Sequence, residues 1–191
     1  MKDTKSMMIV GVGGQGSLLA SKLLGHLLLT EGYDVKVSEV HGMSQRGGSV
    51  VTYVRFGDTV YSPVIDKGGA DMIVSFEPLE AARYAEYLRK DGKVVTGTHR
   101  VDPMPVITGA MQYPEDPLAI IRDRGVEPDT VDALTLAREA GTVKAVNLVL
   151  LGRVSRYFEI AEEAWLSAID ACVPAKFREI NKKAFLLGRN A

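Results

Sequence analysis

Cysteine is almost absent from this chain, whose 191 residues include only Cys172. A disulfide framework is therefore excluded, and such sparing use of cysteine is typical of a reducing compartment. An iron–sulfur cluster held by this chain alone is excluded as well, because such clusters need about four thiolates. Cys172 lies in a helical pattern, where a lone cysteine is more often a small core residue than a nucleophile.

Neither an excess of one charge nor a long hydrophobic run is present. The formal net charge is -1, so no broad basic field attracts nucleic acid or an acidic membrane surface. The apolar run near the start is too short for a signal sequence or a membrane span. The Leu-rich stretch that follows is interrupted by Ser21, Lys22 and His26. We therefore expect a cytoplasmic protein with neither nucleic acid nor a membrane as a partner.

The common catalytic signatures are missing too. The sequence contains no H-E-x-x-H, no G-x-S-x-G and no C-x-x-C, so zinc hydrolases, serine hydrolases and thiol redox proteins have no support. Of the scattered histidines, His99 follows the end of a predicted strand, where α/β sheets place ligands, but alone it is a weak signal. No catalytic residue and no metal site is assigned.

Apolar runs that alternate with helical patterns are the main signal that is present. Strands are predicted at residues 6–10, 35–40, 49–56, 71–76, 93–98 and 129–133. Helices are predicted at residues 15–30, 77–92, 116–125, 143–158, 161–173 and 175–188. A turn at "GDT" predicts a hairpin partner at residues 60–62, and residues 105–111 allow a further strand.

This alternation predicts an α/β fold with a mostly parallel sheet covered on both faces. We expect a Rossmann-like three-layer fold with an antiparallel hairpin and a helical C-terminal third. No repeat or long linker divides the sequence, so residues 1–191 are expected to form one domain with a helical tail from about residue 134. Leucines of the helix at 15–30 are spread more widely than one sheet-facing stripe requires, which predicts that a partner or self-association covers apolar surface.

A glycine-rich turn separates the first strand from the first helix. The segment "GVGGQG" places Gly11, Gly13 and Gly16 in the G-x-G-x-x-G spacing of dinucleotide-binding proteins. Such glycines allow a tight turn, close approach of the backbone to a phosphate, and packing of helix on strand. Glu39 follows Gly16 by 23 residues, at the end of the second strand, where an acid that binds ribose would lie.

Two observations leave a purely structural turn open as an alternative. Gly14 is an additional glycine, which suggests that the turn serves close backbone packing. Glu39 also has His41 and Arg46 as local partners besides a ribose. The same turn narrowly misses a P-loop, because Ser17 stands where the phosphate-binding lysine is required, which argues against an NTPase.

Several longer motifs follow one another along the chain. They are "GVGGQG", "SEVHGMSQRGGSVVTYVR", "YSPVI", "GGADMIVSFEPLEAARY", "AVNLVLLG" and "PAKFREINKKAFLLG". Together they resemble, over essentially the whole chain, the gamma-type domain of 2-oxoacid:ferredoxin oxidoreductases. The "HGMSQRGG" form is most similar to the beta subunit of the indolepyruvate:ferredoxin oxidoreductases.

The resemblance implies oxidative decarboxylation of a 2-oxoacid with coenzyme A, giving an acyl-CoA, CO2 and reduced ferredoxin. It further implies that thiamine diphosphate, Mg and [4Fe-4S] clusters lie on a larger alpha subunit, so that this chain alone binds no cofactor. The residues agree, because one cysteine cannot hold a cluster and the Gly-Asp-Gly run of thiamine enzymes is absent. The absence of a complete set of catalytic residues is then expected for a non-cluster subunit.

In such a subunit the segment Glu39 to Gly48 is interpreted as a loop that faces the partner's active site. Its glycines permit positive φ and close backbone approach, and Arg46 offers a planar, charged group for a carboxylate or phosphate. The alternative is that Arg46 pairs with Glu39 to brace the loop. The cofactor-binding or interface candidates are Gly11, Gly13, Gly14, Gln15, Gly16, Glu39, His41, Gly42, Met43, Arg46, Gly47 and Gly48.

Two other classes of function stay open at this point. The glycine-rich turn and Glu39 are consistent with a stand-alone protein that binds a dinucleotide or nucleotide sugar. A regulatory or scaffold subunit that contributes nothing to a site is also consistent with the missing catalytic residues.

We expect Arg46→Ala to leave folding nearly intact, because a loop charge contributes little to stability. If the guanidinium contacts an anionic group in the transition state, turnover of the assembled enzyme falls about tenfold or more, which corresponds to about 1.4 kcal/mol. Steady-state kinetics and thermal unfolding measure the two effects. Unchanged turnover with a lower unfolding temperature would favour the ion pair with Glu39 instead.

Overall fold

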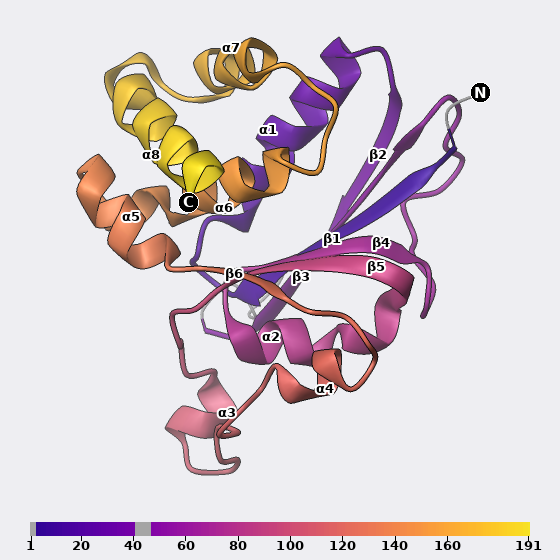
Figure 1. Cartoon of the computed structure of the whole chain (residues 1–191), viewed down its shortest axis with the longest axis vertical. Coiled ribbons are helices and arrows are strands. Elements are labelled where there is room, and N and C mark those ends of the chain that lie inside the picture. Colours follow the sequence, from indigo (N-terminus) through magenta and orange to yellow (C-terminus); the bar gives the residue numbers. More distant parts are fainter. Residues whose placement is uncertain (1–2, 41–46) are drawn as a thin grey trace.

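One mixed sheet forms the centre of the structure, a computed structural model that describes residues 3–40 and 47–191. Its strands lie in the order β2-β3-β1-β4-β5-β6, and helices cover both of its faces (Figure 1). The strands are β1 (Lys5–Val12), β2 (Asp34–Glu39), β3 (Ser49–Gly57), β4 (Ala70–Ser75), β5 (Leu88–Gly97) and β6 (Asp129–Val131). The predicted three-layer α/β fold is confirmed.

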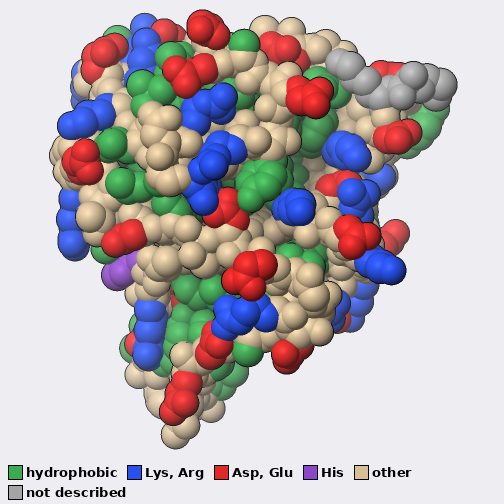
Figure 2. Space-filling view, in the orientation of Figure 1, with side chains coloured by type: hydrophobic (Ala, Val, Ile, Leu, Met, Phe, Trp, Pro, Cys, Tyr) green, Lys and Arg blue, Asp and Glu red, His purple; other side chains and the backbone are tan. Residues whose placement is uncertain are grey.

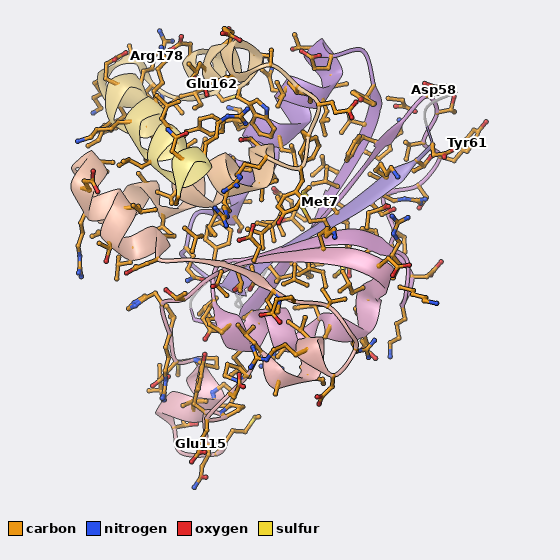
Figure 3. All side chains as sticks on the ribbon, viewed as in Figure 1. Met7, Asp58, Tyr61, Glu115, Glu162 and Arg178 are labelled. Carbon is orange, nitrogen blue, oxygen red and sulfur yellow. The ribbon has the colours of Figure 1, made fainter. Side chains whose placement is uncertain are left out.

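The strand directions show the predicted mixture. β1, β4, β5 and β6 pair in parallel, whereas β3 runs antiparallel to both β1 and β2. The hairpin is therefore β2–β3, and the hairpin partner predicted at 60–62 is wrong. β1 and β2 already pair with the two edges of β3, so the segment that follows β3 cannot add to it as a strand. A side chain holds this segment instead, because Arg55 donates to the carbonyl oxygens of Ser62 and Val64 at 3.0 and 3.1 Å. Tyr61 in this segment is 94% exposed and points outward (Figure 3).

The helices divide between the two faces of the sheet. α1, α5, α6, α7 and α8 cover one face, and α2 and α4 cover the other (Figure 1). Their bounds are α1 (Ser17–Thr30), α2 (Pro78–Arg83), α3 (Met104–Ile107), α4 (Ala119–Arg122), α5 (Ala133–Ala140), α6 (Val146–Ser155), α7 (Glu162–Cys172) and α8 (Arg178–Asn190). Short 3-10 turns lie at Ala85–Tyr87, Val143–Ala145 and Ala175–Phe177. The helical C-terminal third is confirmed.

β1 lies inside the sheet and is buried on both faces. Met7 and Ile9 point into the core beneath α1 and the C-terminal helices. Met8 and Val10 point into the smaller core beneath α2 and α4. A strand covered on both faces needs apolar side chains at every position, which explains why this run shows no alternation of polar and apolar residues.

The wide apolar face of α1 is used mostly within the chain. α1 packs against β2 and β3 of the sheet and also against α6 and α7. Its buried leucines are Leu23, Leu24, Leu27 and Leu28. Leu18 and Leu29 stay 49% and 60% exposed. Two packing surfaces therefore account for most of the spread of leucines, and coverage of the rest by a partner stays a prediction.

α6 and α8 pack in direct backbone contact through two glycines. A Cβ added to Gly152 would overlap the carbonyl oxygen of Phe185, and one added to Gly188 would overlap that of Val149. Glycine permits such an approach because it has no Cβ. The motifs "NLVLLG" and "AFLLG" thus form one helix pair.

The helix predicted over residues 77–92 is wrong in its second half. α2 ends at Arg83, and β5 already begins at Leu88, which pairs with Ala70 of β4. Leu88 is buried in the core beneath α2, and Asp91 has a positive φ of 64°, which a right-handed helix does not allow. Burial within the sheet outweighs the local helix propensity here.

Residues 101–117 form an arm that projects from the body of the molecule, with Glu115 near its tip (Figure 3). The strand allowed at 105–111 is wrong, because α3 occupies this stretch with Pro105 in its first turn. Proline suits a first helical turn but cannot donate to a strand ladder. The helix predicted at 116–125 is shortened to the single turn of α4.

The surface carries charges of both signs. Figure 2 shows Lys and Arg side chains intermixed with Asp and Glu over the face in view, in agreement with the net charge of -1. Among the helices that the structure describes, none combines the length and the hydropathy that crossing a bilayer requires.

Gly188→Ala should lower the free energy of unfolding by about 2 kcal/mol or more, because the added methyl group must push α6 and α8 apart. Gly25→Ala is the matched control, since a Cβ there would lie 3.6 Å from Val37 Cγ2. Alanine is favoured over glycine in a helix by about 1 kcal/mol, so the control should be neutral or stabilising. Urea denaturation measures both, and equal losses would contradict the glycine contact.

Candidate functional site

The carboxyl edge of the sheet brings several of the predicted residues together. Because β3 is antiparallel, its first residues lie beside the ends of its neighbours, and Val12 of β1 pairs with Ser49. The glycine-rich turn (residues 11–16), Glu39 and Gly47–Ser49 therefore share one edge. Open α/β sheets bind ligands at this edge.

The glycine-rich turn is hydrogen-bonded to the chain itself. The Val12 N–H donates to Gln15 Oε1 at 2.7 Å, and the Gly13 N–H donates to the Gly48 carbonyl oxygen at 2.8 Å. A Cβ on Gly11 would lie 2.7 Å from Gln15 Oε1 and 3.1 Å from Phe76 Cβ, so a side chain there would displace the Gln15 amide that accepts from Val12. In the dinucleotide fingerprint the second glycine lets the backbone approach the pyrophosphate, whereas here the N–H of that glycine holds the opposite loop.

The last two glycines of the turn have backbone conformations that favour glycine. Gly14 and Gly16 have φ of 101° and 89°, a region that favours glycine. A Cβ on Gly16 would lie 3.0 Å from Asn147 Nδ2, but one on Gly14 would meet nothing within 4 Å. Asn147, a buried polar residue of α6, donates to the Gly16 carbonyl oxygen at 3.3 Å. Backbone conformation thus favours glycine at both positions, and close packing against Asn147 adds a second reason at Gly16.

A cleft of about 270 Å³ opens between the glycine-rich turn and the end of β2. Its lining includes Glu39 and Val40 together with Ser17 and Leu18 of α1. The Glu39 carboxylate accepts a hydrogen bond from the Ser21 hydroxyl at 2.5 Å. Glu39 therefore lies opposite the turn, as a ribose-binding acid would, but one of its oxygens already serves a neighbouring helix.

A second cleft, of about 490 Å³, lies on the other side of the same turn. It is lined by Gly14, Gln15, Gly16, Phe76, Gly97, His99, Val101, Ala133, Leu134, Val143, Lys144 and Val146. It sits where β1, β4 and β5 end. Because α1 and α2 leave the sheet on opposite faces, this is the point at which open α/β sheets most often bind a ligand. His99 and Lys144 add polar groups to a mostly apolar lining.

Four predicted residues, His41, Gly42, Met43 and Arg46, lie outside the described residues, as does the ion pair suggested between Arg46 and Glu39. Within the described part, no group of three or more His, Cys, Asp and Glu side chains could hold a metal ion. Burial raises the pKa of the Cys172 thiol, which keeps it protonated and agrees with its interpretation as a packing residue.

Glu77 and Glu80 are fully buried at the start of α2, and we call them the carboxylate pair. They were not predicted from the sequence. Glu77 accepts hydrogen bonds from the Tyr113 hydroxyl and from the Glu80 N–H, the latter at 2.9 Å. Glu80 accepts hydrogen bonds from the Ser49 hydroxyl and from Arg83 Nε, the latter at 3.0 Å. The available signal was a Glu-Pro-Leu-Glu segment directly after a buried strand.

The environment of Glu77 favours its protonated form. Burial is the main cause that raises the pKa of its carboxyl group, and the nearby Glu80 carboxylate adds to the rise. The hydrogen bonds from Tyr113 and the backbone act in the opposite direction. Burial also raises the pKa of Tyr113, so its hydroxyl remains a donor at neutral pH.

With this geometry in place, comparison with known proteins decides the family. The model of the pyruvate ferredoxin/flavodoxin oxidoreductase family matches residues 6–191. The chain belongs to this family. The family predicted from the ordered motifs is therefore confirmed.

Similar subunits match this oxidoreductase chain over nearly its whole length. An indolepyruvate oxidoreductase subunit IorB of Thermococcus kodakarensis is 45% identical over 191 residues, which cover 97% of this chain and 95% of that protein. The subunit of the same name from Pyrococcus horikoshii is 46% identical over 194 residues, with the same two shares. As predicted, the chain is a non-cluster subunit of a 2-oxoacid ferredoxin oxidoreductase, and these relatives lend no support to a stand-alone dinucleotide-binding protein.

Solved structures show the same fold for the oxidoreductase subunit. A keto/oxoacid ferredoxin oxidoreductase gamma subunit of Geobacter sulfurreducens superposes with a TM-score of 0.74 at 22% identity, covering 98% of this chain and 95% of that one. A 2-oxoglutarate:ferredoxin oxidoreductase chain of Magnetococcus marinus gives 0.75 at 18% identity, and the match covers 100% of this chain but 31% of that one. At these identities the likeness concerns the fold alone.

Replacing Glu77 should change how stability depends on pH. Above its ordinary value of 4.5 the unfolded chain loses the Glu77 proton while the folded protein keeps it, so the free energy of unfolding falls as pH rises through the raised pKa. Glu77→Gln cannot titrate and should lack this fall. Tyr113→Phe removes a hydrogen bond that lowers the pKa, so its fall should extend to higher pH. Urea denaturation across the pH range measures all three proteins, and parallel curves for wild type and Glu77→Gln would contradict the raised pKa.

Proposed function

We propose that this chain is the non-cluster subunit of an indolepyruvate:ferredoxin oxidoreductase and works only with a larger partner subunit. The observation that carries the proposal is the similarity, over 97% of the chain, to two indolepyruvate oxidoreductase subunits at 45% and 46% identity. In the proposed reaction the 2-oxoacid loses CO2, its acyl group passes to the thiol of coenzyme A, and the released electrons reduce ferredoxin.

The residues of this chain do not fit the cofactors of that reaction. Its single cysteine cannot ligate a cluster, and the described side chains form no group that could hold a metal ion. Thiamine diphosphate with Mg and the [4Fe-4S] clusters, which supply the decarboxylation and electron-transfer chemistry, are therefore assigned to the partner subunit. Ferredoxin would meet the complex on that subunit, and the use of a single cysteine supports a cytoplasmic location.

The part of this chain in the proposal is to complete the partner's active site from the carboxyl edge of the sheet. Gly13, Glu39, Gly47 and Gly48 meet at that edge, and the two clefts on either side of the glycine-rich turn open there. The loop residues between Glu39 and Gly47 belong to the proposal on sequence grounds alone. Coenzyme A carries phosphates and a pantetheine arm whose methyl and methylene groups can contact apolar side chains, and the second cleft, with Lys144 in a mostly apolar lining, offers complementary chemistry.

Mixing the purified chain with its thiamine- and cluster-bearing partner should restore coenzyme A-dependent reduction of ferredoxin or a viologen dye. The chain alone should be colourless, bind no iron and oxidise no 2-oxoacid, because it lacks the ligands for both cofactors. Among 2-oxoacids, indolepyruvate and other arylpyruvates should react best. The same reduction assay with each subunit omitted in turn provides the controls.

Preference for pyruvate or 2-oxoglutarate would retain the family and overturn the assignment to indolepyruvate. Turnover by the purified single chain would overturn the subunit assignment itself.

A further inference from the structure

The carboxylate pair joins segments that are far apart in the sequence. Ser49, which donates to Glu80, lies 31 residues before it, and Tyr113, which donates to Glu77, lies 36 residues after it. Both carboxylates are fully buried. One short helix, α2, therefore holds the start of β3 on one side and the arm (residues 101–117) on the other.

Glu80 acts on the segment Gly47–Ser49, which leads into β3. Three separate parts of the chain fix this segment. The glycine-rich turn donates from the Gly13 N–H to the Gly48 carbonyl oxygen at 2.8 Å, and the arm donates from the Met104 N–H to the Gly47 carbonyl oxygen at 3.3 Å. The third contact is the hydrogen bond from the Ser49 hydroxyl to Glu80, so each residue of the segment is anchored, and the Ser49 hydroxyl also lies 3.3 Å from that of Tyr84.

Glu77 acts on the arm. Most of the arm is exposed, including Met104, Ile107 and Met111 at 46%, 63% and 51%. Tyr113 is one of its few half-buried residues, and it contacts the body through Glu77 and the Arg100 guanidinium, which lies 4.0 Å from the centre of its ring. The arm that supports Gly47 is thus itself oriented through Tyr113.

Such an arrangement is a poor way to gain stability. Two carboxyl groups removed from water cost free energy that apolar side chains of similar size would not cost. Their hydrogen bonds are, however, directional and specify one geometry. The pair lies near the carboxyl edge: Glu77 follows Phe76, which lines the second cleft, and Glu80 bonds Ser49, whose neighbour Val50 lines the first.

We propose that Glu77 and Glu80 are positioning residues for the reaction of the assembled enzyme, because through Tyr113 and Ser49 they hold the arm and the segment Gly47–Ser49 in fixed relation at the carboxyl edge. This inference rests on the proposed function. It assigns no contact of either carboxylate with a substrate or cofactor. Their effect passes through the two hydroxyl groups.

The test compares hydroxyl deletions in the complex reconstituted with the partner subunit. Ser49→Ala and Tyr113→Phe each remove one hydroxyl donor of the pair and leave the carboxylates in place. Ser155→Ala is the matched control for the first, because Ser155 is fully buried and donates to the Gly152 carbonyl oxygen at 2.6 Å, far from this edge. Tyr61→Phe, at a tyrosine that is 94% exposed, is the control for the second.

We expect Ser49→Ala and Tyr113→Phe to assemble with the partner as wild type does and to lower kcat by about tenfold or more. Ser49→Thr, which keeps the hydroxyl, should recover most of the loss. Both controls should retain wild-type kcat, even where Ser155→Ala lowers the unfolding temperature as much as Ser49→Ala does. Loss of kcat in proportion to the loss of stability across all variants would overturn the inference.

Amide hydrogen exchange of the full chain without its partner gives an independent readout. Ser49→Ala should accelerate exchange of the Gly13 and Met104 amides, which donate to the same segment, whereas Ser155→Ala should not. If the reconstituted wild type shows no turnover, the proposed function fails, and the exchange experiment then tests the part of the inference that concerns the fixed position of the segment Gly47–Ser49. Unchanged exchange at both amides would overturn it.

Discussion

The hydrogen bond from the Gly13 N–H to the Gly48 carbonyl oxygen is the contact on which the arrangement of the carboxyl edge depends. It joins the turn after β1 to the residues that lead into β3, and it uses the backbone donor that a dinucleotide-binding turn offers to a phosphate. Because β3 is antiparallel to β1, the two segments meet at one end of the sheet. A turn with the dinucleotide spacing thus serves as an internal connection between two loops.

The other features of the edge follow from this connection. With Gly48 fixed, Ser49 is placed to bond Glu80, and Gly47 is placed to bond the arm. The result is a shaped edge with two clefts and without a metal-binding group among the described residues. Such an edge can orient groups supplied by another subunit, which is the part that the proposed function assigns to this member of the oxidoreductase family.

Local signals predicted most of the elements, and long-range contacts decided the rest. Patterns among neighbouring residues were enough to predict β1 from its uniform apolar run, α1 from the glycines before it, and the apolar helices after residue 134. The end of α2 was not, because it depends on Leu88 pairing with Ala70. The carboxylate pair was missed for the same reason: the hydroxyl groups that bind Glu80 and Glu77 come from Ser49 and Tyr113, more than thirty residues away, and the local Glu-Pro-Leu-Glu segment does not indicate them.

The most direct test of this account is a calorimetric titration of the isolated chain with NAD and FAD. We expect no saturable binding of either dinucleotide, because the Gly13 N–H donates to Gly48 and Glu39 already accepts a hydrogen bond from the Ser21 hydroxyl. Coenzyme A is titrated in parallel. Its binding would concern the two clefts and would not test whether the turn binds a dinucleotide. Stoichiometric binding of NAD or FAD, abolished by a bulky substitution at Gly13, would contradict the claim that the glycine-rich turn is an internal connection.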